Sequence, residues 1–418
     1  MNSSANPETS QHGAKIEDAE AFPLFGLVAL AAAIFISMVT EFLPGGLIPL
    51  IAADFDRSVS DVGNLVTVFA ATVIVTAAPA AILTRRIPRK PLILVTLGMI
   101  GLGNIATVFS PSFEFMLGAR IFGAFAHGLF WSVVAAYPAH LVRASQLGKA
   151  MAITAAGGSV SGIVGIPLGN ALGQAYGWRV SFGIVAVLVL LVGVFLAWKL
   201  PNVVIKPKEP APEGNASKAK VASTLPAILI VCLLILLAVG AQNSYGTFTV
   251  VWLQDVANLA PATIPIVLFI SGIAGAVGVA ITGALYSRYP AKIMMVSLAG
   301  LVLLLALFPV AANNEPAVWL MSGLMSMIFG GVPVMLQTRM MATASAEQRN
   351  LAAALQTTAF NVGIGGGTFI GGLAISWFSL GNLPTISAVL MFAALIVAAI
   401  WEILARQRRV ISPILEKV

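Results

Sequence analysis

The sequence predicts an all-α membrane protein in which twelve transmembrane helices form two pseudo-symmetric six-helix halves. Three observations lead to this fold class. The chain of 418 residues is 59% hydrophobic and only 9% charged, apolar runs recur along its whole length, and parts of its first half match its second half at a fixed offset. A soluble domain cannot bury this much apolar surface, whereas a bilayer can solvate it.

Each apolar run is close to the ~20 residues that a helix needs to cross ~30 Å of hydrocarbon. Helices are expected throughout because backbone amides in lipid must be hydrogen-bonded within one segment. The twelve predicted spans are residues 24–51, 60–83, 91–109, 113–141, 149–176, 180–198, 224–252, 262–286, 293–312, 316–341, 351–377 and 384–405.

Lysine and arginine orient the predicted bundle. One set of loops and both tails hold nearly all of them, whereas the opposite loops hold only Arg57 and Arg179. By the positive-inside rule, both termini are expected in the cytoplasm. The net charge of +7 is explained by this topology and by contact with anionic lipid headgroups, so no nucleic-acid partner is expected.

The polar start of the chain lacks the basic region of a cleaved signal peptide, so the first span is expected to remain as a helix. Cys232 is the single cysteine. It can form neither an internal disulfide nor a multi-cysteine metal site, and we expect no metal and no cofactor.

A proline-rich, charged segment at 201–223 reads as a cytoplasmic linker between the halves. It predicts a cytoplasmic tail at 1–22, an N-terminal half at 23–200, a C-terminal half at 224–405 and a cytoplasmic tail at 406–418. The internal repeat supports this division: at one fixed offset Arg86 and Lys90 align with Arg288 and Lys292, and Gly165 and Gly169 align with Gly367 and Gly371.

Glu41, Arg120 and His127 are the only ionisable residues deep within the predicted spans. A charge at this depth costs at least ~2.5–3.5 kcal/mol on insertion scales, so such residues usually serve ion or substrate movement. The repeat places neutral residues opposite all three, which predicts proton handling in the N-terminal half. The C-terminal half offers neutral hydrogen-bonding residues for substrate recognition: Gln242, Asn243, Gln337, Gln356 and Asn361.

Glu41 and Arg120 fall at a similar depth on the first and fourth predicted helices, so a charge pair between them is geometrically possible. Two interpretations stay open. The pair is either a structural ion pair that fixes helix packing, or a proton site in which a movable cation changes the proton affinity of the carboxylate.

His127 shares a helix face with Arg120, nearer the midplane. It is a hydrogen-bonded core residue, a proton relay to Glu41 or a direct substrate ligand. Trp131, one turn further on, is either a stacking surface for substrate or a packing residue.

Four cations stand in the segment Leu83-Thr-Arg-Arg86-Ile-Pro-Arg89-Lys90. They anchor the topology, and the segment also resembles the loop motif G-x-L-x-D-R-x-G-R-K of the major facilitator superfamily. This resemblance implies gating roles for Arg86, Arg89 and Lys90, and for Arg288 in the repeat. Arg85 replaces the motif's Asp, so any gating latch must use other partners.

The stretch Arg120-Ile-Phe-Gly-Ala-Phe-Ala-His127 and the stretch Thr40-Glu41-Phe-Leu-Pro44 resemble the bacterial sugar and arabinose efflux branch of the drug:proton antiporters. The fifth span, with Gly162, Gly165, Pro167 and Gly169, resembles the antiporter motif of that helix, with its proline displaced. The glycines permit close helix packing, and the proline adds a bend that can open and shut; both readings hold together.

The resemblance implies a monomeric carrier in the bacterial inner membrane that exports a small solute, with sugars leading, against inward proton flow. Purine, nucleoside or amphenicol-like drug efflux and proton-linked import remain alternatives. A membrane sensor is disfavoured because no soluble output domain is visible, and an enzyme because no nucleophile and base set appears.

Overall fold

The computed structural model describes residues 22–84, 87–135, 137–143, 146–201, 224–345 and 348–415. Within these ranges all regular structure is helical, and twelve helices are long and apolar enough to cross a membrane. The predicted all-α membrane fold is therefore confirmed. Arg86, nearly all of the predicted N-terminal tail and most of the predicted linker lie outside the described residues, so the roles given to them stay predictions.

The first six spans use nine elements, because a 3-10 turn follows α4 and a π-helical turn interrupts the fifth span. The elements before the linker are α1 (Leu24–Phe55), α2 (Val59–Leu83), α3 (Arg89–Val108), α4 (Phe113–Val134), the 3-10 turn η1 (Tyr137–His140), α5 (Leu147–Val160), the π-helical turn η3 (Ser161–Gly165), α6 (Ile166–Tyr176) and α7 (Trp178–Lys199). We call them the N-terminal half.

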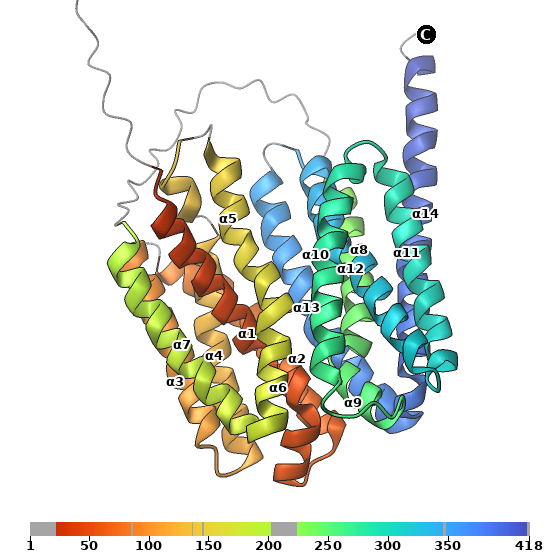
Figure 1. Ribbon diagram of the computed structural model, residues 1–418. Helices are drawn as coiled ribbons and strands as arrows, with labels where there is room; N and C mark the ends of the chain where they lie inside the picture. The colour runs from red at the N-terminus through yellow and green to blue at the C-terminus, as the bar shows by residue number, and fades with distance from the viewer. Residues whose placement is uncertain are drawn as a thin grey trace, which may run out of the picture.

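The elements after the linker form the C-terminal half. They are α8 (Leu225–Gly246), α9 (Thr249–Asp255), α10 (Ile264–Tyr286), α11 (Pro290–Leu307), the 3-10 turn η4 (Phe308–Ala311), α12 (Glu315–Thr343), α13 (Arg349–Trp377), the 3-10 turn η6 (Leu380–Asn382) and α14 (Leu383–Leu415). The predicted seventh span, 224–252, is too long as one helix, because the chain turns at Thr247 and Phe248 and starts the short helix α9. Helix α14 continues past the predicted end at 405 and rises above the other helices in Figure 1.

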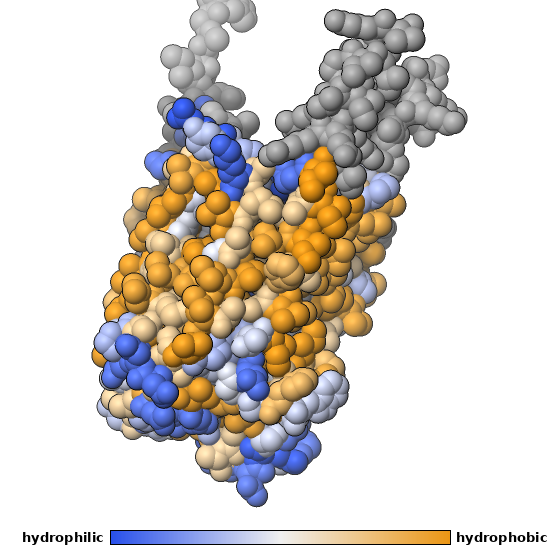
Figure 2. Space-filling view, turned by 90° about the vertical axis from the view of Figure 1, so that its right-hand side faces the viewer, coloured by the Kyte–Doolittle hydropathy of each residue, from blue (hydrophilic) through white to orange (hydrophobic). Residues whose placement is uncertain are grey.

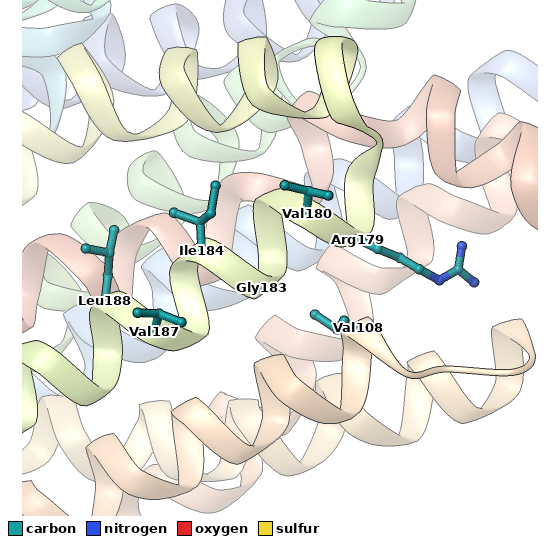
Figure 3. A pocket seen from close by; sticks show the side chains of 7 residues that line it. All are labelled: Val108, Arg179, Val180, Gly183, Ile184, Val187 and Leu188. Carbon is teal, nitrogen blue, oxygen red and sulfur yellow. The ribbon is translucent and has the colours of Figure 1, made fainter.

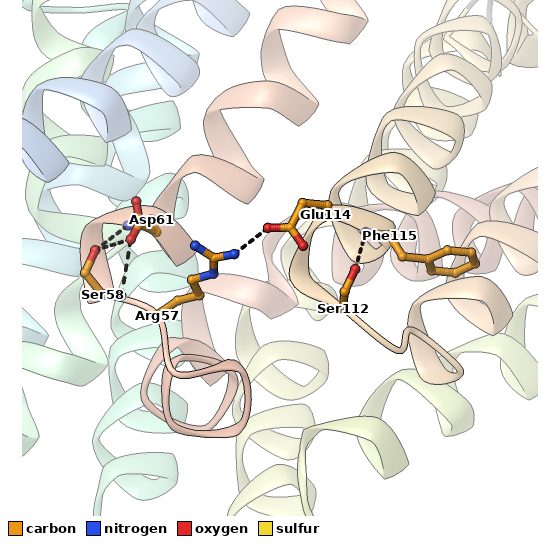
Figure 4. A network of polar contacts seen from close by, with 6 residues as sticks. All are labelled: Arg57, Ser58, Asp61, Ser112, Glu114 and Phe115. Atoms are coloured by element: carbon orange, nitrogen blue, oxygen red, sulfur yellow. Dashed lines mark hydrogen bonds and ion pairs between the residues drawn. The ribbon is translucent and has the colours of Figure 1, made fainter.

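Polar caps and ion pairs hold the helix ends opposite the linker. The Ser58 side chain and Asp61 form a capping box at the start of α2, and the Ser112 hydroxyl caps α4 (Figure 4). Arg57, in the turn between α1 and α2, pairs with Glu114 of α4. The two caps satisfy free backbone N–H groups, so α2 and α4 each begin at a defined residue, and the ion pair ties the start of α4 to the turn before α2.

The outer surface carries the apolar side chains that a bilayer solvates. Hydrophobic residues cover the middle of the face in Figure 2, and hydrophilic residues gather toward its two ends. A shallow apolar groove between α3 and α7 is lined by Val108, Val180, Gly183 and neighbouring residues, and the side chain of Arg179 extends away from it (Figure 3). Arg179 binds Asp54 of α1 at 2.5 Å instead.

The two halves touch closely on the side of the bundle opposite the linker, which we call the far side. Phe248 packs so tightly on Gly63 of α2 that a Cβ atom on that glycine would lie 2.5 Å from the ring. A Cβ on Gly372 of α13 would lie 2.8 Å from the hydroxyl of Ser60. Nearer the midplane, the hydroxyl of Thr67 donates to the carbonyl of Gly365 at 3.2 Å. These uncharged contacts close the far side.

The same two helices separate toward the linker side. Thr358 and Ala354 continue the α13 face that carries Gly365 and Gly372, and both are exposed. Ala71 and Ala78 of α2, which follow Thr67 on the facing side, are exposed as well. The two halves are thus in contact on the far side, and these faces of α2 and α13 are uncovered toward the linker side.

The glycines of the fifth span pack against α1. A Cβ atom on Gly169 would lie 2.5 Å from Leu43, and Gly165 faces Val39 even more closely. The π-helical turn ends where Pro167 begins a new hydrogen-bonding pattern, since the N–H of Ile166 reaches back to the carbonyl of Ser161. Gly162 lies in this turn. A Cβ atom on Gly272 of α10 would lie 2.6 Å from the carbonyl oxygen of Gly162. Gly165 and Gly169 thus lie at close contacts with α1, and the irregular turn lies where the halves meet.

Candidate functional site

Glu41, Arg120 and His127 come together inside the N-terminal half. Glu41 lies in the middle of α1, and the other two lie on α4, two turns apart on one face. Their exposed fractions are 4%, 3% and 3%. All three charge-bearing groups are thus removed from both water and lipid, which requires that each has polar partners nearby.

The carboxylate of Glu41 pairs with His127. Oε2 of Glu41 lies 3.3 Å from Nε2 of the imidazole, and Nδ1 lies 2.8 Å from the hydroxyl of Ser37, one turn earlier on α1. A neutral imidazole can donate from Nε2 to the carboxylate and accept at Nδ1, and a protonated one can donate from both nitrogens. The trio can therefore hold an additional proton without a change of partners.

Arg120 binds the backbone of α1 instead of the carboxylate. Its Nη1 donates to the carbonyl of Thr40 at 2.7 Å and its Nη2 to the carbonyl of Glu41 at 3.1 Å. The carbonyl of Thr40 is free because Pro44, four residues later, has no N–H to offer it. The structure thus shows a different arrangement from a direct Glu41–Arg120 pair. The guanidinium of Arg120 donates to the carbonyls of α1 near Pro44, and the carboxylate of Glu41 pairs with His127.

Two further side chains support this arrangement. Asn104 of α3 is buried and donates from Nδ2 to the hydroxyl of Thr40 at 3.2 Å. Phe69 of α2 lies under the guanidinium of Arg120, 4.4 Å from the ring centre, and 5.1 Å from the ring of His127. A guanidinium over an aromatic face is attracted by the ring quadrupole, so Phe69 holds the cation in place. Sequence reasoning missed both residues, which look like ordinary helix-core residues.

A cavity of about 460 Å³ lies between the halves. Its lining comes from α1, α2 and α6 on one side and from α8, α9, α10, α12 and α13 on the other. Helix α1 presents Met38 and Phe42 to this cavity, while Glu41 faces α4. Glu41, His127 and Ser37, which we call the buried trio, therefore lie directly behind one wall of the cavity and do not line it.

The predicted substrate-binding residues divide into those that reach the cavity and those that do not. Gln242 and Asn243 of α8 line it. His127 lies behind the α1 wall of the cavity. Trp131 is half-buried, and the centre of its ring lies 6.2 Å from the centre of the His127 ring.

The remaining three predicted residues lie elsewhere on α12 and α13. Gln337 is exposed, and Asn361 donates to the carbonyl of Thr357 in its own helix at 3.0 Å. Gln356 is buried with no hydrogen-bond partner for its Oε1 in the described part of the chain.

A second partly buried ion pair escaped the sequence analysis. Arg339 of α12 pairs with Glu402 of α14, and both side chains are mostly covered. Arg339 also donates to the sulfur of Met294 at 3.1 Å and lies 5.4 Å from the ring centre of Trp401. Charge is thus not confined to the N-terminal half, although this pair ties together helices of one half, close to the linker side.

The predicted gating cations lie at helix ends. Arg89 and Lys90 start α3, and Arg288 is exposed and lies 5.4 Å from the ring centre of Tyr289. None of the ion pairs between described residues joins the two halves. Among the described ranges there is also no group of three or more His, Cys, Asp or Glu side chains able to hold a metal ion.

Comparisons with known proteins agree with this architecture. The sequence model of the Major Facilitator Superfamily matches residues 30–365. The fold is similar to two solved structures of a bacterial homolog of the human lysosomal transporter Spinster. The inward-facing, unoccupied form has a TM-score of 0.69 at 16% identity, over 91% of this chain and 96% of the other. The inward-facing, occupied form has a TM-score of 0.72 at 15% identity, over 92% and 97%.

Proposed function

Because the chain belongs to the major facilitator superfamily, which indicates a transporter rather than an enzyme, we propose that it couples solute export to inward proton flow. The observation that carries the coupling is the buried trio of Glu41, His127 and Ser37. Ionisable groups this deep in a membrane are costly and mark ion or proton pathways. The carrier works by alternating access across the bacterial inner membrane, with both termini in the cytoplasm.

Proton binding belongs to the pair of Glu41 and His127 and not to either alone. The carboxylate of Glu41 and the imidazole of His127 are 3.3 Å apart, so a proton bound by either side chain lies in contact with both. Arg120 contributes a fixed positive charge beside the pair, held by two carbonyls. Protonation of the pair weakens its attraction to Arg120, which lets α1 shift relative to α4.

The two halves rock about the cavity between them. In the present state the far side is closed by Phe248 on Gly63 and by Thr67 on Gly365. With the linker in the cytoplasm, this state is open to the cytoplasm and takes up solute there. Gly162, in the π-helical turn that touches α10, lies at the pivot.

The solute is small and uncharged. The resemblance to the sugar efflux branch makes a sugar or sugar-like compound the leading candidate, with amphenicol-like drugs, purines and nucleosides as alternatives. Proton-linked import uses the same machinery, and the direction of flux separates it from export.

The test is transport into inverted membrane vesicles under an imposed pH gradient, with a panel of sugars, purines and antibiotics. A transported solute should accumulate only with the gradient, and Glu41→Gln should abolish accumulation but keep downhill exchange, because a glutamine cannot release a proton. The matched control is Glu114→Gln, which removes a surface carboxylate that is 66% exposed. If Glu41→Gln still concentrates the solute in response to the gradient, the coupling proposal fails.

A further inference from the structure

The chemistry of the cavity between the halves narrows the class of solute. Three of its side chains are phenylalanines, Phe42 of α1, Phe329 of α12 and Phe360 of α13, and aliphatic residues and Pro333 cover most of the remaining wall. No residue with a formal charge lines it. At about 460 Å³, it falls in the ~300–1,000 Å³ range of small-molecule sites.

The polar side chains of the cavity all come from one segment, residues 242–249 of the C-terminal half. Most of their hydrogen-bonding capacity is already used. Asn243 donates to the carbonyl of Val239 at 2.9 Å, Thr247 is bonded to Thr368 at 2.8 Å, and Thr249 donates to the carbonyl of Tyr245 at 3.3 Å.

Gln242 is different from its neighbours. Among the described residues, its side-chain amide has no hydrogen-bond partner. It lies on the cavity side of α8, next to Gly246. The cavity therefore offers one complete amide, with a donor and an acceptor, together with the spare oxygen of Asn243.

This pattern does not suit a charged or a polyhydroxylated ligand. A cation would find no counter-ion, because Glu41 is 4% exposed and paired with His127 behind the α1 wall. A sugar carries a hydroxyl on nearly every carbon, and hydroxyls buried without partners cost about 1–3 kcal/mol each. An uncharged amphiphile with a single polar end avoids both penalties.

We infer that the cavity binds an uncharged amphiphile whose polar end is held by Gln242 and Asn243 of α8 and whose apolar body packs on Phe42, Phe329 and Phe360. This inference rests on the proposed transport function and replaces its leading solute class. The ligand does not touch the proton site, so ligand and proton act on each other only through movement of α1.

The experiment is equilibrium binding of radiolabelled chloramphenicol, an uncharged aromatic molecule with one polar side chain, to the full-length protein in nanodiscs, with empty nanodiscs subtracted. Unlabelled arabinose and tetraphenylphosphonium serve as the polyol and the apolar cation. Saturable chloramphenicol binding that neither competitor displaces is expected. Displacement by arabinose or by the cation at lower concentration than by unlabelled chloramphenicol, or no saturable binding, overturns the inference.

Two variants test the proposed orientation. Gln242→Met keeps the length of the side chain but removes its hydrogen bonds, and should raise the Kd about 3- to 10-fold, as expected for one neutral hydrogen bond. Its control is Gln254→Met on α9, outside the cavity lining. Phe329→Ala should raise the Kd about tenfold or more, because it removes apolar contact with the ligand. Its control is Phe392→Ala on the exposed surface of α14, which should leave the Kd unchanged. Equal effects of a cavity variant and its control contradict the assignment.

The proposed function and this inference fail separately. If arabinose binds and its pH-driven transport requires Glu41, the ligand class is wrong and the coupling proposal stands. If chloramphenicol binds through Gln242 but no solute responds to the pH gradient, the ligand class stands and the coupling proposal is wrong.

Discussion

Substitution of Gly63 by alanine should open the far side of the transporter. A Cβ atom at this position would lie 2.5 and 2.6 Å from two carbons of the Phe248 ring, well inside ordinary contact distance. The Phe248 side chain is fully buried, between Gly63 of α2 and Gly371 of α13, so it cannot turn away while the halves stay closed. Relief of the clash requires the two halves to move apart on this side.

The size of the effect follows from the clash. Overpacking a well-packed contact costs about 1–3 kcal/mol, and this cost applies only to the state closed on the far side. The ratio of far-open to far-closed molecules should therefore rise about 5- to 150-fold. The better helix propensity of alanine acts equally on both states and does not alter this ratio.

The assay is labelling of one engineered cysteine, Thr249→Cys, in a Cys232→Ser background. Thr249 lines the cavity and should react with a membrane-impermeant thiol reagent only when the far side is open. Right-side-out vesicles of the Gly63→Ala variant should label faster by the predicted factor. Gly98→Ala is the control, because a Cβ on Gly98 meets nothing within 4 Å.

A second substitution separates gating from misfolding. Phe248→Leu removes the ring that the new methyl group meets, so combining it with Gly63→Ala should return labelling toward the level of Phe248→Leu alone. If Gly63→Ala labels no faster than Gly98→Ala at equal expression, Phe248 is not the element that closes the far side.

Three more predictions follow from the described contacts. Arg120→Lys should lower stability by about 1–3 kcal/mol in thermal unfolding and reduce transport, because one ammonium cannot replace both guanidinium contacts to carbonyls; wild-type values for both would refute this role. Glu402→Gln should destabilise the protein more than the surface substitution Glu114→Gln does, but by less than the ~3–5 kcal/mol expected when a fully buried ion pair is broken. Equal unfolding temperatures of the two variants would contradict this prediction. In sealed cells, a cysteine at Ser58 should react with an impermeant reagent and one at Ser345 should not; the reverse pattern would invert the topology.

Much of the fold was predictable because membrane solvation imposes strong rules on sequence. The lengths of the apolar runs predicted the number of membrane spans, and isolated charges within those runs pointed to Glu41, Arg120 and His127, which the structure buries. Helix ends were less predictable. The continuous apolar pattern across Thr247 and Phe248 hides a change of direction that depends on tertiary contacts, such as the bond between Thr247 and Thr368.

The partners of the site residues could not be predicted, because they depend on how each helix is rotated about its axis. Glu41 and Arg120 share a depth, but the rotation of α1 directs the carboxylate to His127 and its carbonyls to Arg120. Arg339 and Glu402 each stand near the end of a predicted span, where charges are ordinary, so nothing in the sequence marks them as a pair. Pro44 was the one available signal for the free carbonyl of Thr40.

The bond between Arg120 and the carbonyl of Thr40 also bears on how the protein is assembled. A peptide carbonyl left unsatisfied in lipid costs several kcal/mol, so α1 with its Pro44 break is an incomplete membrane helix until α4 has been synthesised and inserted. Arg120 is equally unsuited to lipid without α1. The biogenesis of the first four helices is therefore a joint event, in which the insertion machinery must retain or shield α1 until its partner emerges from the ribosome.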